Sequence, residues 1–139
     1  MDSKKPLGIL EMARENFVLK TLQEKGEVTW KPKGNSMSPR IHSGDQVKVI
    51  ICDPLAYRVG DAVYAKVKGN YYLHLLTAID TSTGTGYNAR YQISNNHGHV
   101  NGWTDGKNMF GICVLVKEKV ILTNQQISDR IEESRGAGK

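Results

Sequence analysis

Ser36 is the residue of this chain whose surroundings most favour chemistry. It lies in residues 34–45, GNSMSPRIHSGD, directly before a methionine and three residues before Pro39. Proline fixes its own φ and pushes Ser38 toward an extended backbone, so a stiff, non-helical segment follows the serine. Such a segment can hold one hydroxyl at a fixed angle beside a cleft. The alternative is a plain polar loop, because Gly, Asn, Ser and Pro gather in turns.

The histidines do not suggest a metal site. His97 and His99 are two residues apart without an evident third ligand, so we expect loop residues here and neither a metal nor another cofactor. His42 follows the serine segment and is expected to face solvent, although it could line the same cleft. His74 lies in an apolar, strand-like run, where a single histidine is most often a core residue with a satisfied hydrogen bond.

The bulk composition predicts one globular domain. The chain has 139 residues, of which 39% are hydrophobic and 24% charged. No apolar run approaches the roughly 18 residues that a membrane helix needs, and charges interrupt the N-terminal segment, so we expect neither a membrane span nor a secretory signal. Cys52 and Cys113 lie in apolar, strand-like runs. Buried free thiols in a reducing compartment, the cytoplasm, are therefore expected.

A formal net charge of +5 raises the possibility of nucleic-acid binding. Much of the positive charge comes as lysine pairs two residues apart, Lys31/Lys33, Lys66/Lys68 and Lys117/Lys119. We expect each pair to share one face of its strand, and the pairs together to form the solvated face of a sheet. No specific nucleic acid is expected, although a groove for phosphate stays open.

The periodicity predicts a β domain between two helices. We expect a helix over residues 7–25, strands over 27–33, 46–52, 62–67, 71–79, 91–94, 110–116 and 119–122, and a short helix after 123 with a frayed tail over 135–139. Gly69-Asn70 is the expected hairpin turn, and residues 81–88 and 95–108 are expected to be polar loops. The division is therefore an N-terminal helix (1–26), a β domain (27–122), and a C-terminal helix and tail (123–139).

Several segments, taken in order, resemble one group of serine peptidases. They are GNSMSP at 34–39, GD at 44–45, YRVGDAV at 57–63, LHLL at 73–76, NN at 95–96 and FGI at 110–112. The group comprises the type I signal peptidases and the self-cleaving domains of SOS repressors. The resemblance runs from about Val28 to Val116.

The resemblance implies a fold, a mechanism and a substrate. The fold is mainly β, an antiparallel coiled sheet or partly open barrel of the signal-peptidase/LexA-like type, here with an N-terminal amphipathic helix and a short C-terminal helix. Ser36 takes the place of the nucleophile, and His74 that of the base, as in the archaeal and endoplasmic-reticulum signal peptidases. The backbone N–H of Ser36, with the side chain of Asn35 or Ser38, would stabilise the oxyanion. The substrate would be an extended polypeptide beside a strand edge.

The chain departs from the family pattern at the residues that would assist the base. Leu75 follows His74 where an arginine is usual, and Ser94 stands where an aspartate would help to orient the base. For the later aspartate of that segment, Asn101 or Asp105 could substitute. The chain also shows neither the membrane anchor of a signal peptidase nor an Ala-Gly or Cys-Gly dipeptide before Ser36.

Three functional hypotheses stay open. The preferred one is a soluble serine peptidase-like protein, encoded by a phage or mobile element, that cleaves a polypeptide with Ser36 and His74. The second is the same fold without catalysis, acting as a protein-binding or structural module. The third and weakest is a nucleic-acid-binding domain.

Overall fold

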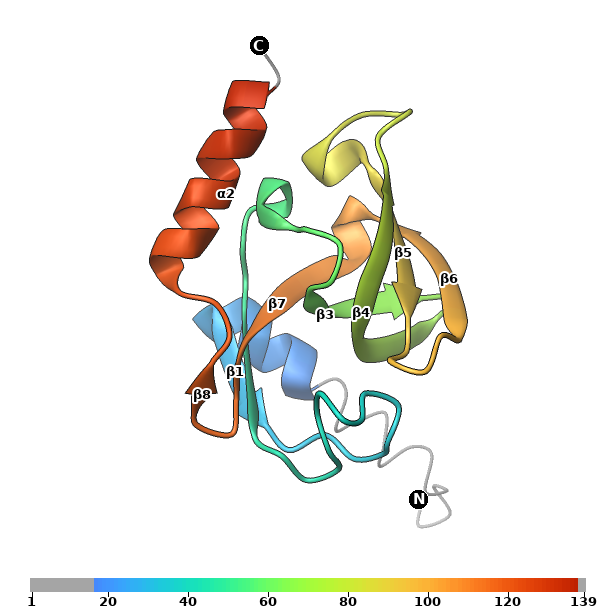
Figure 1. The fold of residues 1–139 in the computed structure, drawn as a ribbon, viewed down its shortest axis with the longest axis vertical. Coiled ribbons are helices and arrows are strands. Elements are labelled where there is room, and N and C mark those ends of the chain that lie inside the picture. Colours follow the sequence, from blue (N-terminus) through green and yellow to red (C-terminus); the bar gives the residue numbers. More distant parts are fainter. Residues whose placement is uncertain (1–16, 138–139) are drawn as a thin grey trace, which may run out of the picture.

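One antiparallel sheet forms the framework of residues 17–137, the part of the chain that the computed structural model describes (Figure 1). Within that part the strands follow the order β1-β2-β7-β3-β4-β5-β6, and β8 pairs with β7. They are β1 (Glu27–Trp30), β2 (Val47–Ile50), β3 (Ala62–Val67), β4 (Asn70–Asp80), β5 (Arg90–Ser94), β6 (Val100–Asp105), β7 (Met109–Val116) and β8 (Lys119–Val120). The prediction of a mainly antiparallel β fold is confirmed.

A helix precedes the sheet and another follows it, as predicted. Residues 17–25 are helical, and α2 covers Asn124–Ala137. The expected N-terminal extension of the first helix, residues 7–16, lies outside the described residues. The C-terminal helix is longer than expected, because it continues through Arg135 and Gly136, which the sequence assigned to a frayed tail.

A tight hairpin sets the register of β3 and β4. Val67 pairs with Asn70, so the turn is the dipeptide Lys68-Gly69, one residue earlier than expected. Both turn residues have positive φ, 51° for Lys68 and 84° for Gly69. A two-residue hairpin with a type I′ turn requires positive φ at both positions. This register places His74 of β4 directly opposite Val63 of β3.

The strand β6 corrects the prediction of a polar loop over residues 95–108. Its sequence, VNGWTD, contains Asn, Gly and Asp, which are rare in strands. Pairing with β5 along its length overrides these weak propensities. Thr104 on β6 also donates a hydrogen bond from Oγ1 to the carbonyl oxygen of Lys66 on β3, at 2.8 Å. The sheet therefore curls, so that its last strand returns toward β3.

Two hydrophobic clusters occupy the sides of the curled sheet. One contains Val63, Leu76 and Ile112 and is covered by Ile127 of α2. The other contains Leu22 of the first helix together with Val28, Met37, Ile41, Val47, Leu73 and Cys113. The serine segment is thus attached to the second cluster through Met37 and Ile41, which are 4% and 3% exposed.

Arginines attach α2 to the turn that precedes β3. Arg130 of α2 forms an ion pair with Asp61 at 2.8 Å. Arg58 donates a hydrogen bond to the carbonyl oxygen of Arg130 at 2.9 Å and another to that of Leu55. These bonds join α2 to the 3-10 turn η1 (Pro54–Ala56) and to Asp61, the residue directly before β3.

The lysine pairs do not share strand faces as the sequence predicted. Lys31 and Lys33 follow the end of β1, and Lys68 and Lys117 lie in turns with positive φ. Only Lys66 and Lys119 of the pairs belong to described strands. Spacing alone could not reveal where the strands end.

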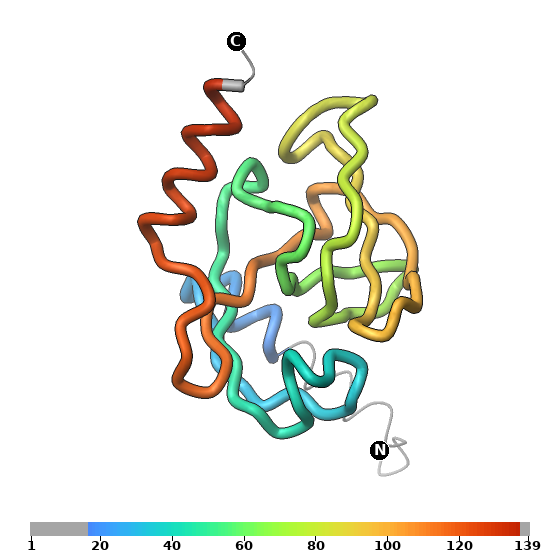
Figure 2. Tube along the Cα trace, viewed as in Figure 1, coloured from blue at the N-terminus to red at the C-terminus, as the bar shows by residue number. Residues whose placement is uncertain are grey.

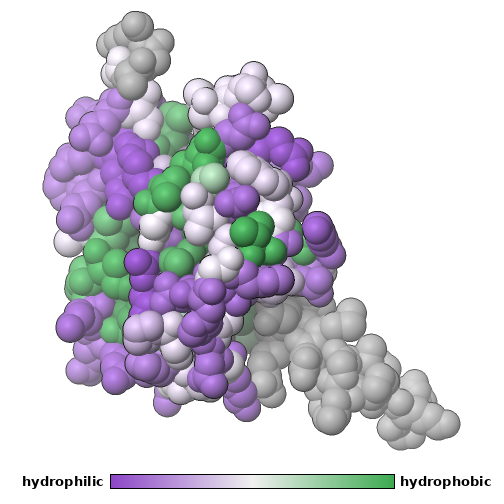
Figure 3. Space-filling view, turned by 45° about the vertical axis from the view of Figure 1, so that its right-hand side comes forward, coloured by the Kyte–Doolittle hydropathy of each residue, from purple (hydrophilic) through white to green (hydrophobic). Residues whose placement is uncertain are grey.

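The remaining surface is mixed in character. On the face in Figure 3, hydrophobic side chains gather in separate patches among hydrophilic ones.

Both cysteines are free, Cys113 buried and Cys52 half-buried. Burial raises the pKa of Cys52 to about 12 and that of Cys113 to about 11. These thiols are therefore unreactive near neutral pH. No helix within residues 17–137 is long and apolar enough to cross a membrane.

Candidate active site

Ser36 lies in a short loop that is fixed at several points. The Ser38 N–H donates to the Asn35 carbonyl oxygen at 3.1 Å, and the Ile41 N–H donates to the Met37 carbonyl oxygen at 2.9 Å. Since the side chains of Met37 and Ile41 are buried, the backbone that follows the serine is anchored in the hydrophobic core. Ser36 itself is half-buried, so its hydroxyl is positioned but reachable.

His74 contacts the Ser36 hydroxyl. The ring lies on β4, 8% exposed, and its Nε2 is 2.9 Å from Ser36 Oγ. Its Nδ1 is 2.7 Å from Oδ1 of Asn101 on β6. An amide oxygen can only accept, so Nδ1 carries the ring proton and Nε2 is free to accept the proton of the serine hydroxyl. The arrangement Ser36–His74–Asn101 has the order of nucleophile, base and orienting group.

A β-bulge directs Asn101 toward the histidine. Gly102 pairs with Ile93 and Val100 pairs with Ser94, which leaves Asn101 as an extra residue without a partner on β5. Bulges bend a strand and change the direction of a side chain, and they are frequent beside active sites. The sequence left Asn101 and Asp105 open as orienting residues, and the structure brings Asn101 to the histidine.

The surroundings of His74 favour its neutral form. Burial lowers the pKa of His74 below its ordinary value of 6.5; the hydrogen bond to Asn101 opposes this effect, and the charge of His99 adds to it. A neutral imidazole at neutral pH is the form that can accept a proton. The site is therefore prepared for a base rather than for an acid.

Tyr72 completes the contacts of the imidazole. Its ring stacks on that of His74 with centroids 4.7 Å apart and an interplanar angle of 29°. Residues two apart on a strand share a face, so the spacing of Tyr72 and His74 in the sequence is the signal for this contact. The tyrosine ring limits how far the imidazole can rotate.

The turn between β5 and β6 holds the serine loop from the other side, and Figure 2 shows the two segments next to each other. The Asn96 N–H donates to the Ser36 carbonyl oxygen at 2.8 Å. Its side-chain amide donates to the carbonyl oxygens of Ser38 at 2.9 Å and of Met37 at 3.4 Å. His97 approaches the same loop, with Nε2 2.9 Å from the carbonyl oxygen of Asn35.

The other predicted site residues have different partners. Ser94 is buried, and its hydroxyl shares a hydrogen bond of 2.8 Å with Thr77. The Asp105 carboxylate accepts a hydrogen bond from Asn108 at 3.2 Å. Asn35 and Ser38 flank the nucleophile, and the bonds that the structure gives them come from their backbone groups.

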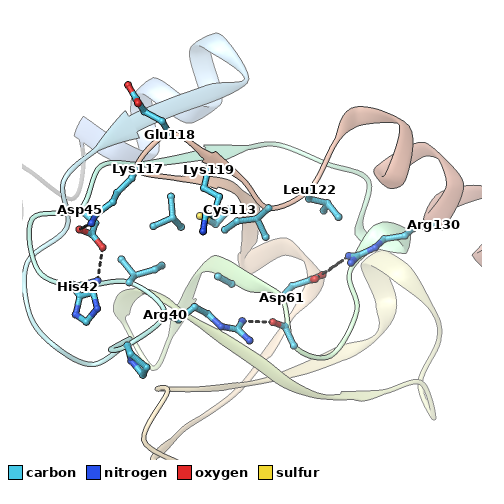
Figure 4. A pocket seen from close by; sticks show the side chains of 16 residues that line it. Arg40, His42, Asp45, Asp61, Cys113, Lys117, Glu118, Lys119, Leu122 and Arg130 are labelled. Atoms are coloured by element: carbon cyan, nitrogen blue, oxygen red, sulfur yellow. Dashed lines mark hydrogen bonds and ion pairs between the residues drawn. The ribbon is translucent and has the colours of Figure 1, made fainter.

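A groove of about 940 Å³ lies beside the serine loop (Figure 4). Its apolar lining consists of Pro39, Ile41, Ala62, Cys113, Val116, Ile121 and Leu122. His42, which is exposed, and Asp45 lie toward one end, and the ion pair of Asp61 with Arg130 lies toward the other. Arg40 crosses the space between and donates a hydrogen bond to the Gly60 carbonyl oxygen at 2.6 Å. Ser36, His74 and Asn101 do not belong to the residues that line this groove.

Metal chemistry has no candidate site within residues 17–137, where no group of three or more His, Cys, Asp or Glu side chains could hold an ion. The histidines near the serine loop instead contact protein atoms, as His74 and His97 do.

In comparisons with known proteins, no family model matches this chain, and no curated protein matches it either.

Proposed function

We propose that the chain is a serine peptidase-like protein with the fold of signal peptidases and SOS-repressor peptidase domains. The observation that carries the proposal is the hydrogen-bonded series Ser36 Oγ, His74 and Asn101 Oδ1, with distances of 2.9 Å and 2.7 Å. The three residues come from a loop, from β4 and from the bulge of β6. Nucleophile, base and orienting group within hydrogen-bond distance of one another are the geometry that nucleophilic catalysis by serine needs.

The mechanism follows from the proton positions. Ser36 Oγ attacks the carbonyl carbon of a peptide bond, while its proton moves to Nε2 of His74. The tetrahedral intermediate collapses as the imidazolium returns this proton to the leaving amine, and an ester on Ser36 remains. Water activated by the same imidazole then hydrolyses the ester. Asn101 keeps the ring oriented throughout, because Nδ1 never gives up its proton.

The backbone N–H of Ser36 would stabilise the oxyanion. Within the described residues this N–H has no hydrogen-bond acceptor, so it is available to a substrate. An extended polypeptide would bind through main-chain hydrogen bonds. One feature supports this substrate: β6, which carries Asn101, is the last strand of the sheet order.

The free thiols support a reducing compartment such as the cytoplasm as the place of action. Cys52 and Cys113 form no disulfide, and burial keeps both thiols protonated.

Cleavage of a random peptide library tests the proposal. The wild-type protein should yield cleaved products that disappear in Ser36→Ala and His74→Ala. Ser128→Ala, which removes an exposed hydroxyl from α2, should cleave like the wild type. Circular dichroism should show the same unfolding midpoint for Ser36→Ala, because a half-buried hydroxyl contributes little to the core.

A binding module without catalysis is the second candidate. Asn101 favours it, because a neutral amide does not offset the positive charge that His74 gains during attack. Retained capture of library peptides without any cleavage, lost on changing Ser36 to a bulky leucine, would support the module in place of the enzyme.

A further inference from the structure

His97 contacts the peptide group between Asn35 and Ser36. Within the described residues, it provides the one side-chain hydrogen bond to this group. Its Nε2 lies 2.9 Å from the Asn35 carbonyl oxygen, to which the Ser38 N–H also donates at 3.1 Å. The Asn35 oxygen thus has two donors, one from within the loop and one from the turn between β5 and β6. Two donors on one oxygen leave the peptide group little freedom to rotate.

The turn that presents His97 is itself well held. Oδ1 of Asn95 accepts hydrogen bonds from the backbone N–H groups of His97 at 2.8 Å and of His99 at 2.9 Å. The Asn95 N–H donates to the His99 carbonyl oxygen at 2.9 Å. Asn96 then ties this turn to the serine loop through the Ser36 carbonyl oxygen. The imidazole of His97 therefore projects from a rigid base, although the side chain is exposed.

The geometry of the peptide bond transmits this contact to the reactive centre. A trans peptide is planar, and its C=O and N–H point in opposite directions. Fixing the Asn35 carbonyl toward His97 consequently fixes the Ser36 N–H on the opposite side of the plane. That N–H has no acceptor within residues 17–137 and is the group that would meet a developing oxyanion.

We propose that His97 is a positioning residue, whose Nε2–H orients the Asn35–Ser36 peptide and thereby aims the Ser36 N–H at the oxyanion. This rests on the proposed function, since the oxyanion forms only if Ser36 reacts. The ring needs a proton on Nε2, which both the neutral Nε2–H tautomer and the imidazolium provide. The contact accordingly survives protonation of His97.

Two matched substitutions separate the hydrogen bond from the bulk of the side chain. In His97→Gln the amide nitrogen lies at about the reach of Nε2, whereas in His97→Asn it lies one bond shorter. With a fluorophosphonate probe, we expect His97→Asn and His97→Ala to lower the maximal rate of Ser36 modification roughly tenfold, with the probe's half-saturating concentration unchanged. This loss is smaller than the roughly hundredfold effect of deleting an oxyanion donor itself. His97→Gln should stay within about threefold of the wild type.

His99→Ala is the control from the same turn. At pH 8 it should react at the wild-type rate, because no hydrogen bond within the described residues joins the His99 side chain to the serine loop. Equal rates for wild type, His97→Ala and His97→Asn would overturn the positioning role. So would a loss in His97→Gln as large as that in His97→Ala.

Nuclear magnetic resonance decides the inference independently of any reaction. The ¹⁵N spectrum of the wild type should show His97 protonated at Nε2 at pH 8, and the Ser36 amide signal should shift in His97→Ala and return in His97→Gln. A His97 ring without a proton on Nε2, or a Ser36 amide whose chemical shift is the same in the wild type and in His97→Ala, would contradict the inference. If the wild type does not react with the probe but these shifts occur, the proposed function fails and the contact with the Ser36 peptide stands.

Discussion

Asn101 is the residue that most separates this site from a Ser-His-Asp triad. Its Oδ1 fixes the tautomer of His74 as a carboxylate would, at 2.7 Å. It carries no charge, however, so it cannot stabilise the imidazolium that forms when Ser36 loses its proton. The hydrogen bonds of a triad are therefore all present, but the negative charge that would stabilise the imidazolium is missing. A slow peptidase is the expected consequence.

Replacing Asn101 with aspartate should supply the missing charge. We expect Asn101→Asp to raise the rate of Ser36 modification by the fluorophosphonate roughly tenfold or more, because a carboxylate stabilises the imidazolium. Asn101→Ala should lower the rate, since the ring loses its orienting partner. Asn124→Asp, which makes the same change at an exposed position of α2, should leave the rate unchanged. An Asn101→Asp protein no faster than the wild type would argue against a catalytic role for this contact.

The pH dependence should report the depressed pKa of His74. Burial keeps the imidazole neutral to lower pH, so the acidic limb of the rate profile should have its midpoint below 6.5. In Asn101→Asp this midpoint should move upward. A wild-type limb centred above 6.5 would contradict a buried neutral base.

Stability should follow the same group with a defined sign. The folded state binds the His74 proton less readily than the unfolded chain does, so the unfolded state binds more protons as the pH falls through 6.5. The contribution of His74 to the unfolding free energy is therefore complete above pH 6.5 and decreases below it. In His74→Gln, measured by urea unfolding, that part of the decrease should be absent.

The sequence could identify Ser36 and His74 as candidates, because short motifs mark them. It could not choose between Asn101 and Asp105, since the choice depends on a one-residue bulge between β5 and β6. It placed His97 in a loop but did not predict its contact with Asn35, which joins residues 62 positions apart in the chain. Contacts made by loops across the fold leave no local pattern to read.

At the scale of elements, β6 is the one on which the site depends and the one the sequence missed. Its Asn, Gly and Asp residues predicted a loop, yet pairing with β5 makes it a strand. The hairpin of β3 and β4 was easier to predict, because two strand-like runs flank a Gly-containing turn. Local signals located the strand of the base, and tertiary pairing formed the strand of the orienting residue.

Gly102 should be the least replaceable residue of β6. Its φ is +142°, and a Cβ there would lie 3.1 Å from Val67 Cγ1 and 3.2 Å from Lys68 Cε. We expect Gly102→Ala to cost about 1–3 kcal/mol of stability and to slow the reaction of Ser36 by displacing Asn101. Gly136→Ala in α2, where a Cβ meets nothing within 4 Å, should instead stabilise by up to about 0.5 kcal/mol. Urea unfolding of both variants measures the contrast.

At the scale of the whole molecule, the site depends on a curled sheet that both helices support. The loop of Ser36 packs on one cluster through Met37, whereas α2 covers the other and reaches the turn before β3. The relative position of the loop, β4 and β6 therefore depends on packing over the entire domain. Composition and periodicity predicted the β class, but the closure of the sheet depends on long-range contacts such as Thr104 with Lys66.

The ion pair that attaches α2 should contribute to global stability. Arg130 and Asp61 are 23% and 11% exposed and 2.8 Å apart. Arg130→Met should cost about 1–3 kcal/mol, because the mostly buried carboxylate keeps the hydrogen bond from the Arg58 N–H but loses its cationic partner. The pair of Arg135 with Asp53, 3.6 Å apart and 66% and 35% exposed, is the control. Arg135→Met should cost less than about 0.5 kcal/mol. Similar unfolding midpoints for the two variants would show that the buried pair does not hold α2.

The most direct test of the central claim is intact mass after incubation with the fluorophosphonate, followed by peptide mapping. The account predicts one adduct per chain, located on Ser36, and at least a hundredfold slower formation in His74→Ala, because the base activates the hydroxyl. An unmodified wild-type protein would contradict it. So would an adduct on Ser36 that forms as fast in His74→Ala as in the wild type.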